Sequence, residues 1–254
     1  MPQGSSPGIE EARIKVAYAN RKHTIPKGRY SFFNEANLFI VQERERQFLA
    51  LLKQYGFASL HAKSILEIGC GAGFWLREFI KWGARPENLT GVELLDHRVA
   101  EAVRLCPEAV RVECRNAAKL SFPDAEFDLV FQSMAFSSIL DQGLKQQVAS
   151  EMSRVVKPDG LILWYDFHIN NPRNPDVRGV KKREIQRLFS GCSIRLRRLT
   201  LAPPLVRMIA PSSWMLSSLL ARIPFLCTHY LGVIRKGASI LVFAELPWLL
   251  LSSV

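Results

Sequence analysis

The segment SILEIGCGAGFWL, residues 64–76, constrains the fold of this chain more than any other feature. An apolar run typical of a buried strand leads into Gly69, Gly71 and Gly73, and a helical pattern follows at once. Glycines at this spacing let the backbone turn tightly and let a ligand approach it closely. The segment therefore predicts strand, turn and helix, with a ligand at the carboxyl edge of an open α/β sheet.

The same alternation continues along the chain, which predicts a parallel sheet covered by helices on both faces. The expected strands are 64–69, 88–94, 110–115, 126–134 and 161–167, and the expected helices are 74–81, about 98–105 and 143–156. A KPDG turn is expected at 157–160, and residues 193–202 and 229–236 are typical of a final antiparallel pair. The fold class is thus α/β, with a Rossmann-like, seven-stranded, mostly parallel sheet whose last strand is antiparallel.

The chain of 254 residues, 48% hydrophobic and 22% charged, is long enough for one sizeable core with decorations. We divide it into an N-terminal tail with cap helices, residues 1–58, and a main domain, residues 59–254. Residues 1 to about 15 are polar and are expected to be frayed. Asn37 is expected to cap the helix that follows it, because apolar side chains recur there at three- and four-residue steps.

The composition of the chain indicates in which environment it works and which partners it favours. Five scattered cysteines, without any CxxC pair, suggest neither disulfides nor a zinc site, so we expect reduced thiols, a cytoplasmic location and no metal. The net charge of +11 favours an anionic partner. The apolar tail 238–254 is short for a membrane span and contains Glu245 and Pro247, so we expect no crossing there. Peripheral membrane contact through this tail stays open.

A second signal gives the glycine turn its meaning. Glu93 ends the next expected strand about 20 residues further on, where an acidic side chain can bind both hydroxyls of a ribose. Either feature alone has a plainer explanation, as a tight connection or a solvated acid, but the pair predicts a nucleoside pocket. Phe74, Trp75 and Leu76 follow Gly73, so the third glycine of a GxGxxG dinucleotide loop is missing.

Five motifs occur in one order: LEIGCGAG, GVEL, RNAAKL, FPDAEFDLV and VVKPDG. Over residues 60–170 this order resembles the class I S-adenosylmethionine-dependent methyltransferases. The segments NNPRNPDVRG and LLARIPFLCTHYLGVIRK resemble the bacterial, small-molecule type of these enzymes. The resemblance implies S-adenosylmethionine as the cofactor. It implies that the glycine loop lies against the methionine and ribose, that Glu93 binds the ribose, and that Leu94 covers the adenine. The implied cofactor-binding residues are Glu67, Gly69, Gly71, Gly73, Glu93, Leu94, Asn116, Ala117 and Gln132.

One of these positions departs from the usual pattern of that family. Asn116 stands where aspartate is common, and it would read the adenine amino edge together with the Ala117 backbone. An amide oxygen can still accept a hydrogen bond from that amino group. Gln132 would face the methionine portion. Ordinary packing or loop solvation is the alternative for Leu94, Asn116 and Gln132.

Methyl transfer is an in-line displacement in which positioning matters most and a general base is optional. The segment YDFHINNPRNPD, residues 165–176, follows the fifth expected strand. Asp166 and His168 lie on one face of that strand, so His168 is the candidate base and Asp166 its orienter or a substrate ligand. A loop histidine beside an Asx turn is an equally good explanation.

An apolar insertion at about 203–226, between the last two strands, is longer than a hairpin requires and resembles the lids of small-molecule methyltransferases. With the N-terminal segment it could enclose a substrate, although its aromatic side chains could equally complete the core. The candidate substrate-binding residues are Tyr30, Phe33, Tyr165, Trp214 and Met215.

The sequence therefore predicts methyl transfer to a small molecule that can be anionic, such as a sugar, a lipid-linked glycan or a secondary metabolite. An RNA methyltransferase is the first alternative, because the chain is basic. FQSMAFSS stands where an NPPY-type tetrapeptide would follow the fourth strand, and no separate RNA-binding module is visible, which disfavours nucleic acid. A non-catalytic partner subunit is the second alternative. The sequence does not indicate the acceptor atom or the oligomeric state.

Overall fold

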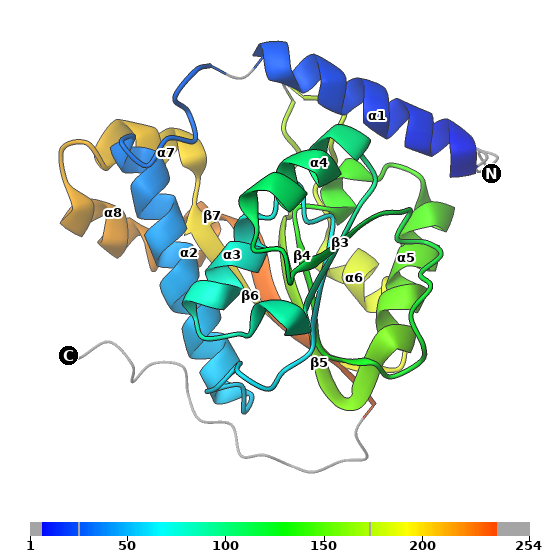
Figure 1. The fold of residues 1–254 in the computed structure, drawn as a ribbon. Coiled ribbons are helices and arrows are strands. Elements are labelled where there is room, and N and C mark those ends of the chain that lie inside the picture. Colours follow the sequence, from blue (N-terminus) through cyan, green and yellow to red (C-terminus); the bar gives the residue numbers. More distant parts are fainter. Residues whose placement is uncertain (1–6, 25, 173, 238–254) are drawn as a thin grey trace.

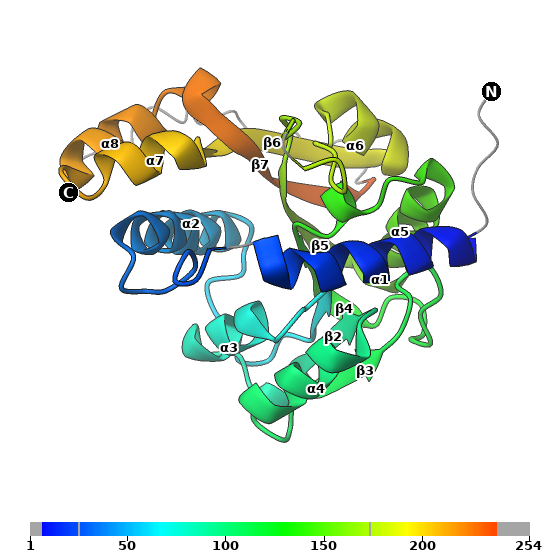
Figure 2. The same ribbon diagram turned by 90° about the horizontal axis from the view of Figure 1, so that it is seen from above.

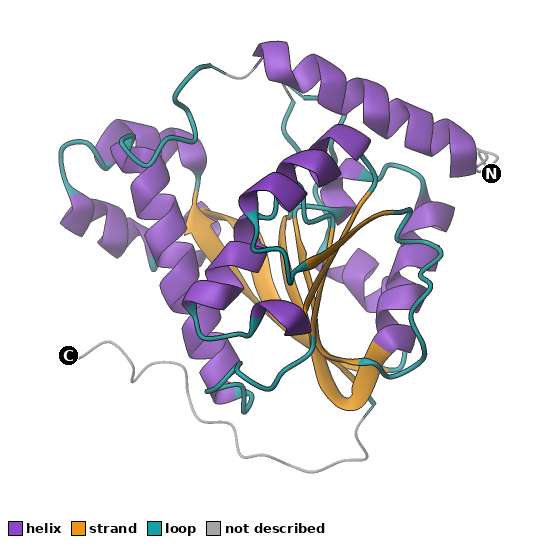
Figure 3. Ribbon diagram, in the orientation of Figure 1, coloured by secondary structure: helices purple, strands orange, loops and turns teal. Residues whose placement is uncertain are grey.

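A computed structural model describes residues 7–24, 26–172 and 174–237 of the chain. Its centre is a seven-stranded sheet with helices on both faces (Figures 1 and 3). The strand order is β3-β2-β1-β4-β5-β7-β6, and β7 runs antiparallel to both of its neighbours. The predicted fold class is confirmed. The strands are β1 (Ile65–Ile68), β2 (Leu89–Glu93), β3 (Arg111–Cys114), β4 (Phe127–Ser133), β5 (Val156–Phe167), β6 (Cys192–Leu201) and β7 (Cys227–Lys236).

The central strands are apolar on both sides because both sides are covered. Along β5, Ile162 and Trp164 belong to one core cluster, whereas Leu163 and Tyr165 belong to the other. The helices are α1 (Pro7–Thr24), α2 (Glu35–Gln54), α3 (Phe74–Lys81), α4 (Asp96–Leu105), α5 (Gln142–Val155), α6 (Lys182–Leu188), α7 (Pro203–Ile209) and α8 (Trp214–Ala221). Short 3-10 turns lie at η1 (Pro86–Asn88), η2 (Phe136–Ser138) and η3 (Pro224–Leu226).

Two local predictions were wrong. Helix α2 is capped by Asn34, whose side chain accepts a hydrogen bond from the backbone N–H of Asn37 at 3.2 Å. The Asn37 amide instead donates to the carbonyls of Tyr30 and Ser31, so the residue three positions earlier takes the cap. The KPDG segment, 157–160, is part of β5, which shifts its register against β4 next to it.

The polar N-terminus is also more ordered than its composition suggests. Residues 7–15, expected to be frayed, are the first half of α1, which lies across the sheet at the carboxyl ends of its strands (Figure 2). The buried carboxylate of Glu10 accepts from the backbone N–H groups of Leu140 and Asp141 and pairs with Arg13. Arg13 in turn donates to the carbonyl of Ser138 at 2.6 Å. These long-range contacts fix α1 to the loop after β4.

The insertion between β6 and β7 forms α7, α8 and η3, and it packs against α2 (Figure 1). Phe39 of α2 meets Trp214 of α8 edge to face, with ring centroids 5.6 Å apart. No helix within the described ranges is long and apolar enough to cross a membrane. The apolar tail, residues 238–254, lies outside the described residues, and the proposed membrane contact through it stays a prediction.

The first prediction concerns the docking of α1. Burial alone would raise the pKa of Glu10, but Arg13 and the backbone donors of Leu140 and Asp141 lower it, so the carboxylate is the docked form. Glu10→Gln should weaken this contact and accelerate backbone hydrogen exchange in α1 about tenfold, with the sheet unaffected. The matched control is Lys15→Gln, at an exposed position of the same helix. Equal exchange in both variants would show that Glu10 does not anchor the helix.

The second prediction concerns Asp128, which joins β4 to the residues before β1. Its carboxylate accepts from the backbone and hydroxyl of Ser64 and from Lys157 at 2.9 Å. Burial by itself would raise the pKa of Asp128, yet the contacts with Ser64 and Lys157 lower it to about 2. A lowered pKa stabilises the fold above the ordinary aspartate pKa, and this stability is lost as the pH falls towards 2. Asp128→Asn should reduce the free energy of unfolding by about 1–2 kcal/mol at pH 7. Urea unfolding at pH 7 and near pH 2 checks this, because the difference should vanish at the lower pH.

Candidate functional site

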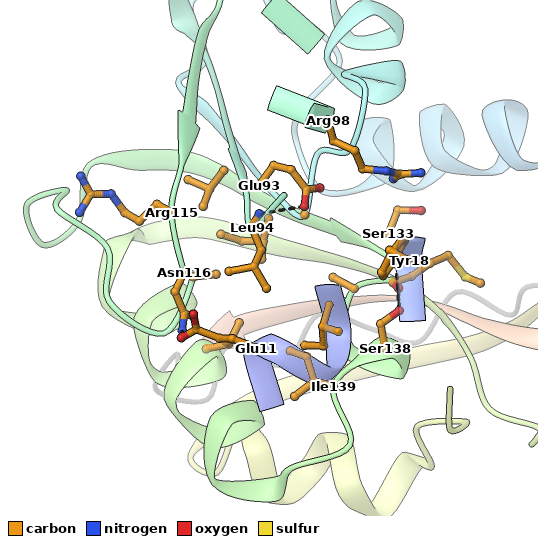
Figure 4. Close-up of a pocket in the computed structure, with 18 of the residues that line it drawn as sticks. Glu11, Tyr18, Glu93, Leu94, Arg98, Arg115, Asn116, Ser133, Ser138 and Ile139 are labelled. Carbon is orange, nitrogen blue, oxygen red and sulfur yellow. Dashed lines mark hydrogen bonds between the residues drawn. The ribbon is translucent and has the colours of Figure 1, made fainter. Parts of the chain in front are cut away.

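A cavity of about 390 Å³ opens at the carboxyl ends of β1, β2 and β4, next to the residues that follow β3 (Figure 4). Helix α1 roofs it with Glu11, Ile14 and Tyr18. This is the edge of the sheet where the glycine turn was expected to meet a ligand. Of the predicted cofactor-binding residues, five line the cavity: Gly69, Glu93, Leu94, Asn116 and Ala117.

The glycines of the loop serve different needs. All three have positive φ, a conformation that side chains rarely adopt. Gly69 lines the cavity, and a Cβ there would lie 3.1 Å from the Cβ of Ala135. A Cβ on Gly73 would lie 2.5 Å from the sulfur of Cys106, so Gly73 allows α3 to pack against the end of α4. Gly71 and Gly73 are not among the residues that line the cavity.

Glu93 holds the loop as well as facing the cavity. One carboxylate oxygen accepts from the backbone N–H of Gly71 at 2.8 Å. The other accepts from the N–H groups of Leu94 at 2.8 Å, drawn in Figure 4, and of Leu95 at 3.0 Å. Each carboxylate oxygen can accept two hydrogen bonds, so Glu93 has one remaining lone-pair site for a ribose hydroxyl. The structure therefore gives Glu93 a scaffolding role that the motif alone did not predict.

Asn116 lies at the opposite side of the cavity, after β3. Its amide oxygen accepts from the backbone N–H of Ala118 at 2.8 Å, and its amide nitrogen donates to Glu11 of α1 (Figure 4). A second lone pair on the oxygen is left for an adenine amino group. Leu94 and Ala117 line the cavity and pack, partly buried, against the core, which suits the flat face of a base.

Glu67 and Gln132 lie beneath the cavity. Glu67 is 1% exposed, and one of its carboxylate oxygens, Oε2, has no hydrogen-bond partner within the described part of the chain. Burial first, and then the neighbouring Glu93, raise the pKa of Glu67 well above its ordinary value. Gln132 is fully buried and accepts from the backbone N–H of Ala135 at 3.2 Å. Neither residue reaches the cavity surface.

The geometry does not support the catalytic pair suggested by the sequence. Asp166 is fully buried and accepts from the backbone N–H groups of Ser137 and Phe167, so it fixes η2 to the end of β5. His168 turns away, with its Nε2 3.2 Å from the carbonyl oxygen of Cys227 and its ring stacked on Tyr230. Burial and Arg198 lower the pKa of His168. Neither side chain lines the cavity, and no hydrogen bond joins the two described residues.

The candidate substrate residues are separated in the same way. Tyr30, 59% exposed, lines the cavity. Tyr165 is buried in the core with its hydroxyl 2.8 Å from that of Thr200. Phe33 is fully exposed, and Trp214 and Met215 belong to α8, which packs on α2 rather than at the cavity. An enclosing role for these three residues therefore stays a prediction without support from the cavity.

Sequence reasoning missed the contribution of α1. Ile14 and Tyr18, four residues apart, face the cavity, and the Tyr18 hydroxyl lies 3.1 Å from that of Ser138. Arg98 of α4 lies over the Tyr18 ring at 5.1 Å, which closes the roof on the other side. The four-residue spacing of Ile14 and Tyr18 was the available signal. It was hidden because the surrounding residues are polar.

The family comparison agrees with this geometry. Residues 65–160 match the family described as "Methyltransferase domain". The chain is 30% identical over 129 residues to the 2-methyl-6-phytyl-1,4-hydroquinone methyltransferase of Synechocystis sp., covering 50% of this chain and 39% of that protein. It is also 30% identical over 111 residues to the tRNA N(3)-cytidine methyltransferase METTL2 of Gallus gallus, covering 41% and 30%. The chain thus spans about two fifths or less of these relatives.

Solved structures share the fold. The 1,6-didemethyltoxoflavin-N1-methyltransferase of Burkholderia thailandensis matches with a TM-score of 0.58 at 18% identity, covering 92% of both chains. A SAM-dependent methyltransferase of Archaeoglobus fulgidus matches with a TM-score of 0.55 at 19% identity, covering 78% of this chain and 98% of that one. Residues 65–160 of the present chain match the methyltransferase-domain family, and the chain has the fold of these methyltransferase structures, as the sequence predicts.

Proposed function

We propose that this chain is an S-adenosylmethionine-dependent methyltransferase whose acceptor is a small molecule, such as a sugar, a lipid-linked glycan or a secondary metabolite. The observation that carries the proposal is the cavity at the sheet edge, where Gly69, Glu93 and Asn116 converge from three successive strand ends. An acidic side chain after the second strand beside a glycine turn after the first is the arrangement expected for a nucleoside.

The residues present fit this cofactor. When bound, S-adenosylmethionine supplies a methyl group on a positively charged sulfur for in-line displacement. Glu93 keeps one lone-pair site for a ribose hydroxyl, and the Asn116 oxygen keeps one for an adenine amino group. Glu67 lies beneath the cavity and does not line it, so we assign it no direct contact with the cofactor.

The form of the cavity supports a small acceptor. Its volume is about 390 Å³, and α1 covers it with Tyr18 and Ile14. A partly covered cavity of this volume suits small-molecule ligands. The hydroquinone and toxoflavin enzymes named above also carry small-molecule acceptors in their names, which is in keeping with the proposal.

Catalysis by positioning is the simplest account of this site. His168 and Asp166 are engaged with the backbone and lie outside the cavity. Holding a nucleophile in line can by itself supply a large share of the rate enhancement, and an amine that arrives deprotonated needs no base. We therefore propose that the acceptor binds beside Ser133, at the end of β4, and Tyr30, in the segment before α2. Both residues line the cavity.

A binding titration and a methyl-transfer assay test the proposal. Isothermal titration calorimetry with S-adenosylmethionine and S-adenosylhomocysteine should give micromolar binding, with NADH as the inactive control. A labelled-methyl assay on small anionic and glycan-like acceptors then tests transfer, with tRNA as a separate arm because of the Gallus gallus relative. Transfer to tRNA alone would contradict the small-molecule acceptor. Absence of cofactor binding in folded protein would favour the partner-subunit alternative.

Glu93→Ala tests the centre of the site. The substitution removes the acceptor for three backbone N–H groups and for the ribose, so binding of S-adenosylhomocysteine should weaken at least about tenfold. Glu101→Ala, at an exposed position on α4, is the matched control and should bind like the unmodified chain. Thermal unfolding confirms that both variants fold. Unchanged affinity in Glu93→Ala would refute the ribose assignment.

A further inference from the structure

A second cavity, of about 380 Å³, lies between α2, β6 and α8. It shares no lining residue with the cavity at the carboxyl ends of β1, β2 and β4. These elements lie side by side at the end of the sheet away from β3 (Figure 2). The cavity is polar and basic. It is lined by Phe39, Glu43, Arg46, Gln47, Arg197, Arg198, Leu199, Ser218, Ala221 and Arg222.

The lining of this cavity contains four arginines but only one carboxyl group, that of Glu43. Arg197 is fixed in place, because its guanidinium donates to the backbone carbonyl of Gln47 on α2 at 3.0 Å. Arg46, Arg198 and Arg222 take part in no ion pair with any residue that the structure describes. Like charges held together repel one another unless a counter-charge is present, and guanidinium groups present forked donors that match tetrahedral oxyanions.

Glu43 gives independent support for a ligand at this place. It is 94% removed from solvent, and its Oε2 has no hydrogen-bond partner among the described residues. Burial raises the pKa of Glu43 to about 7, although Arg46 and Arg197 act in the opposite direction. Near neutral pH a large fraction of the group is therefore protonated, and its O–H can donate to an oxyanion. A buried polar atom without a partner calls for a bound group.

We propose that the cavity between α2, β6 and α8 is a binding site for a tetrahedral oxyanion, namely a phosphate group of a soluble ester or of a lipid headgroup. Arg46 lies on α2, Arg197 on β6 and Arg222 directly after α8, so the three guanidinium groups come from different elements. A lipid headgroup is one source of this phosphate because Met215 of α8 is 76% exposed, as is usual for side chains that enter a bilayer surface. This inference goes beyond the proposed function, and its readout is binding, so it stands or falls independently of methyl transfer.

The test uses the full chain and three probes: sulfate, glycerol 3-phosphate, and vesicles of phosphatidylglycerol against vesicles of phosphatidylcholine. The double variant Arg46→Gln/Arg222→Gln removes two donors of the site. Arg183→Gln/Arg187→Gln removes the same charge from exposed positions on α6 and is the matched control. Calorimetry measures the soluble probes and co-sedimentation measures the vesicles.

The site variant should weaken binding of the soluble probes at least about tenfold, whereas the control should stay within about twofold. Selective loss of binding to phosphatidylglycerol alone would also support the site and would assign it to a lipid headgroup. Equal losses in both double variants would show only a general effect of charge and would overturn the proposal. Absence of binding to all probes by the unmodified chain would overturn it as well.

Glu43→Gln supplies a pH signature. The groups facing Glu43 are Arg46 of α2, Arg197 of β6, Tyr165 of β5 and Cys227 of β7. Burial raises the pKa of both Tyr165 and Cys227, so neither titrates between pH 6 and 8. Sulfate should therefore bind several-fold more tightly at pH 6 than at pH 8, because the Glu43 charge appears across that range. Glu43→Gln should abolish most of this dependence, and an unchanged dependence would contradict the site as described.

Discussion

The carboxylate of Glu93 is the interaction on which the rest of the site depends. It joins the glycine loop after β1 to the turn after β2, because its two oxygens accept hydrogen bonds from the backbone N–H groups of Gly71, Leu94 and Leu95. A carboxylate that receives three backbone donors is fixed in direction, and so is the loop that supplies them. The same carboxylate also holds Leu95, the residue that precedes α4, and it lines the cavity.

Helix α1 adds a second layer of organisation. It reaches over the carboxyl ends of the strands and is tied by Glu10 and Arg13 to the loop after β4, while Tyr18 and Ile14 close the cavity from above. A ligand in this cavity would therefore contact α1 as well as the ends of the strands.

Much of the fold follows from the pattern of the residues. Short apolar runs alternating with amphipathic helices predicted five parallel strands. The structure places four of them within about one residue of the expected bounds, whereas β5 begins at Val156, before its expected start at 161. The cap of α2 was predicted at Asn37 instead of Asn34, because the two residues lie three positions apart and asparagine at either position can cap a helix. The sequence suggested His168 as a general base oriented by Asp166, because residues two positions apart lie on the same face of a strand. That spacing does not reveal which backbone groups each side chain contacts.

By itself the sequence determined the sheet, the glycine turn and the acidic residue that faces it, because these depend on local backbone preferences and on hydrophobic periodicity. Only the tertiary structure decided which polar groups are already satisfied. It showed that Glu93 supports the loop, that Asp166 fixes η2, and that arginines of α2, β6 and α8 gather around one cavity. These outcomes depend on contacts between residues that are distant in the chain, and such contacts arise only when the elements pack.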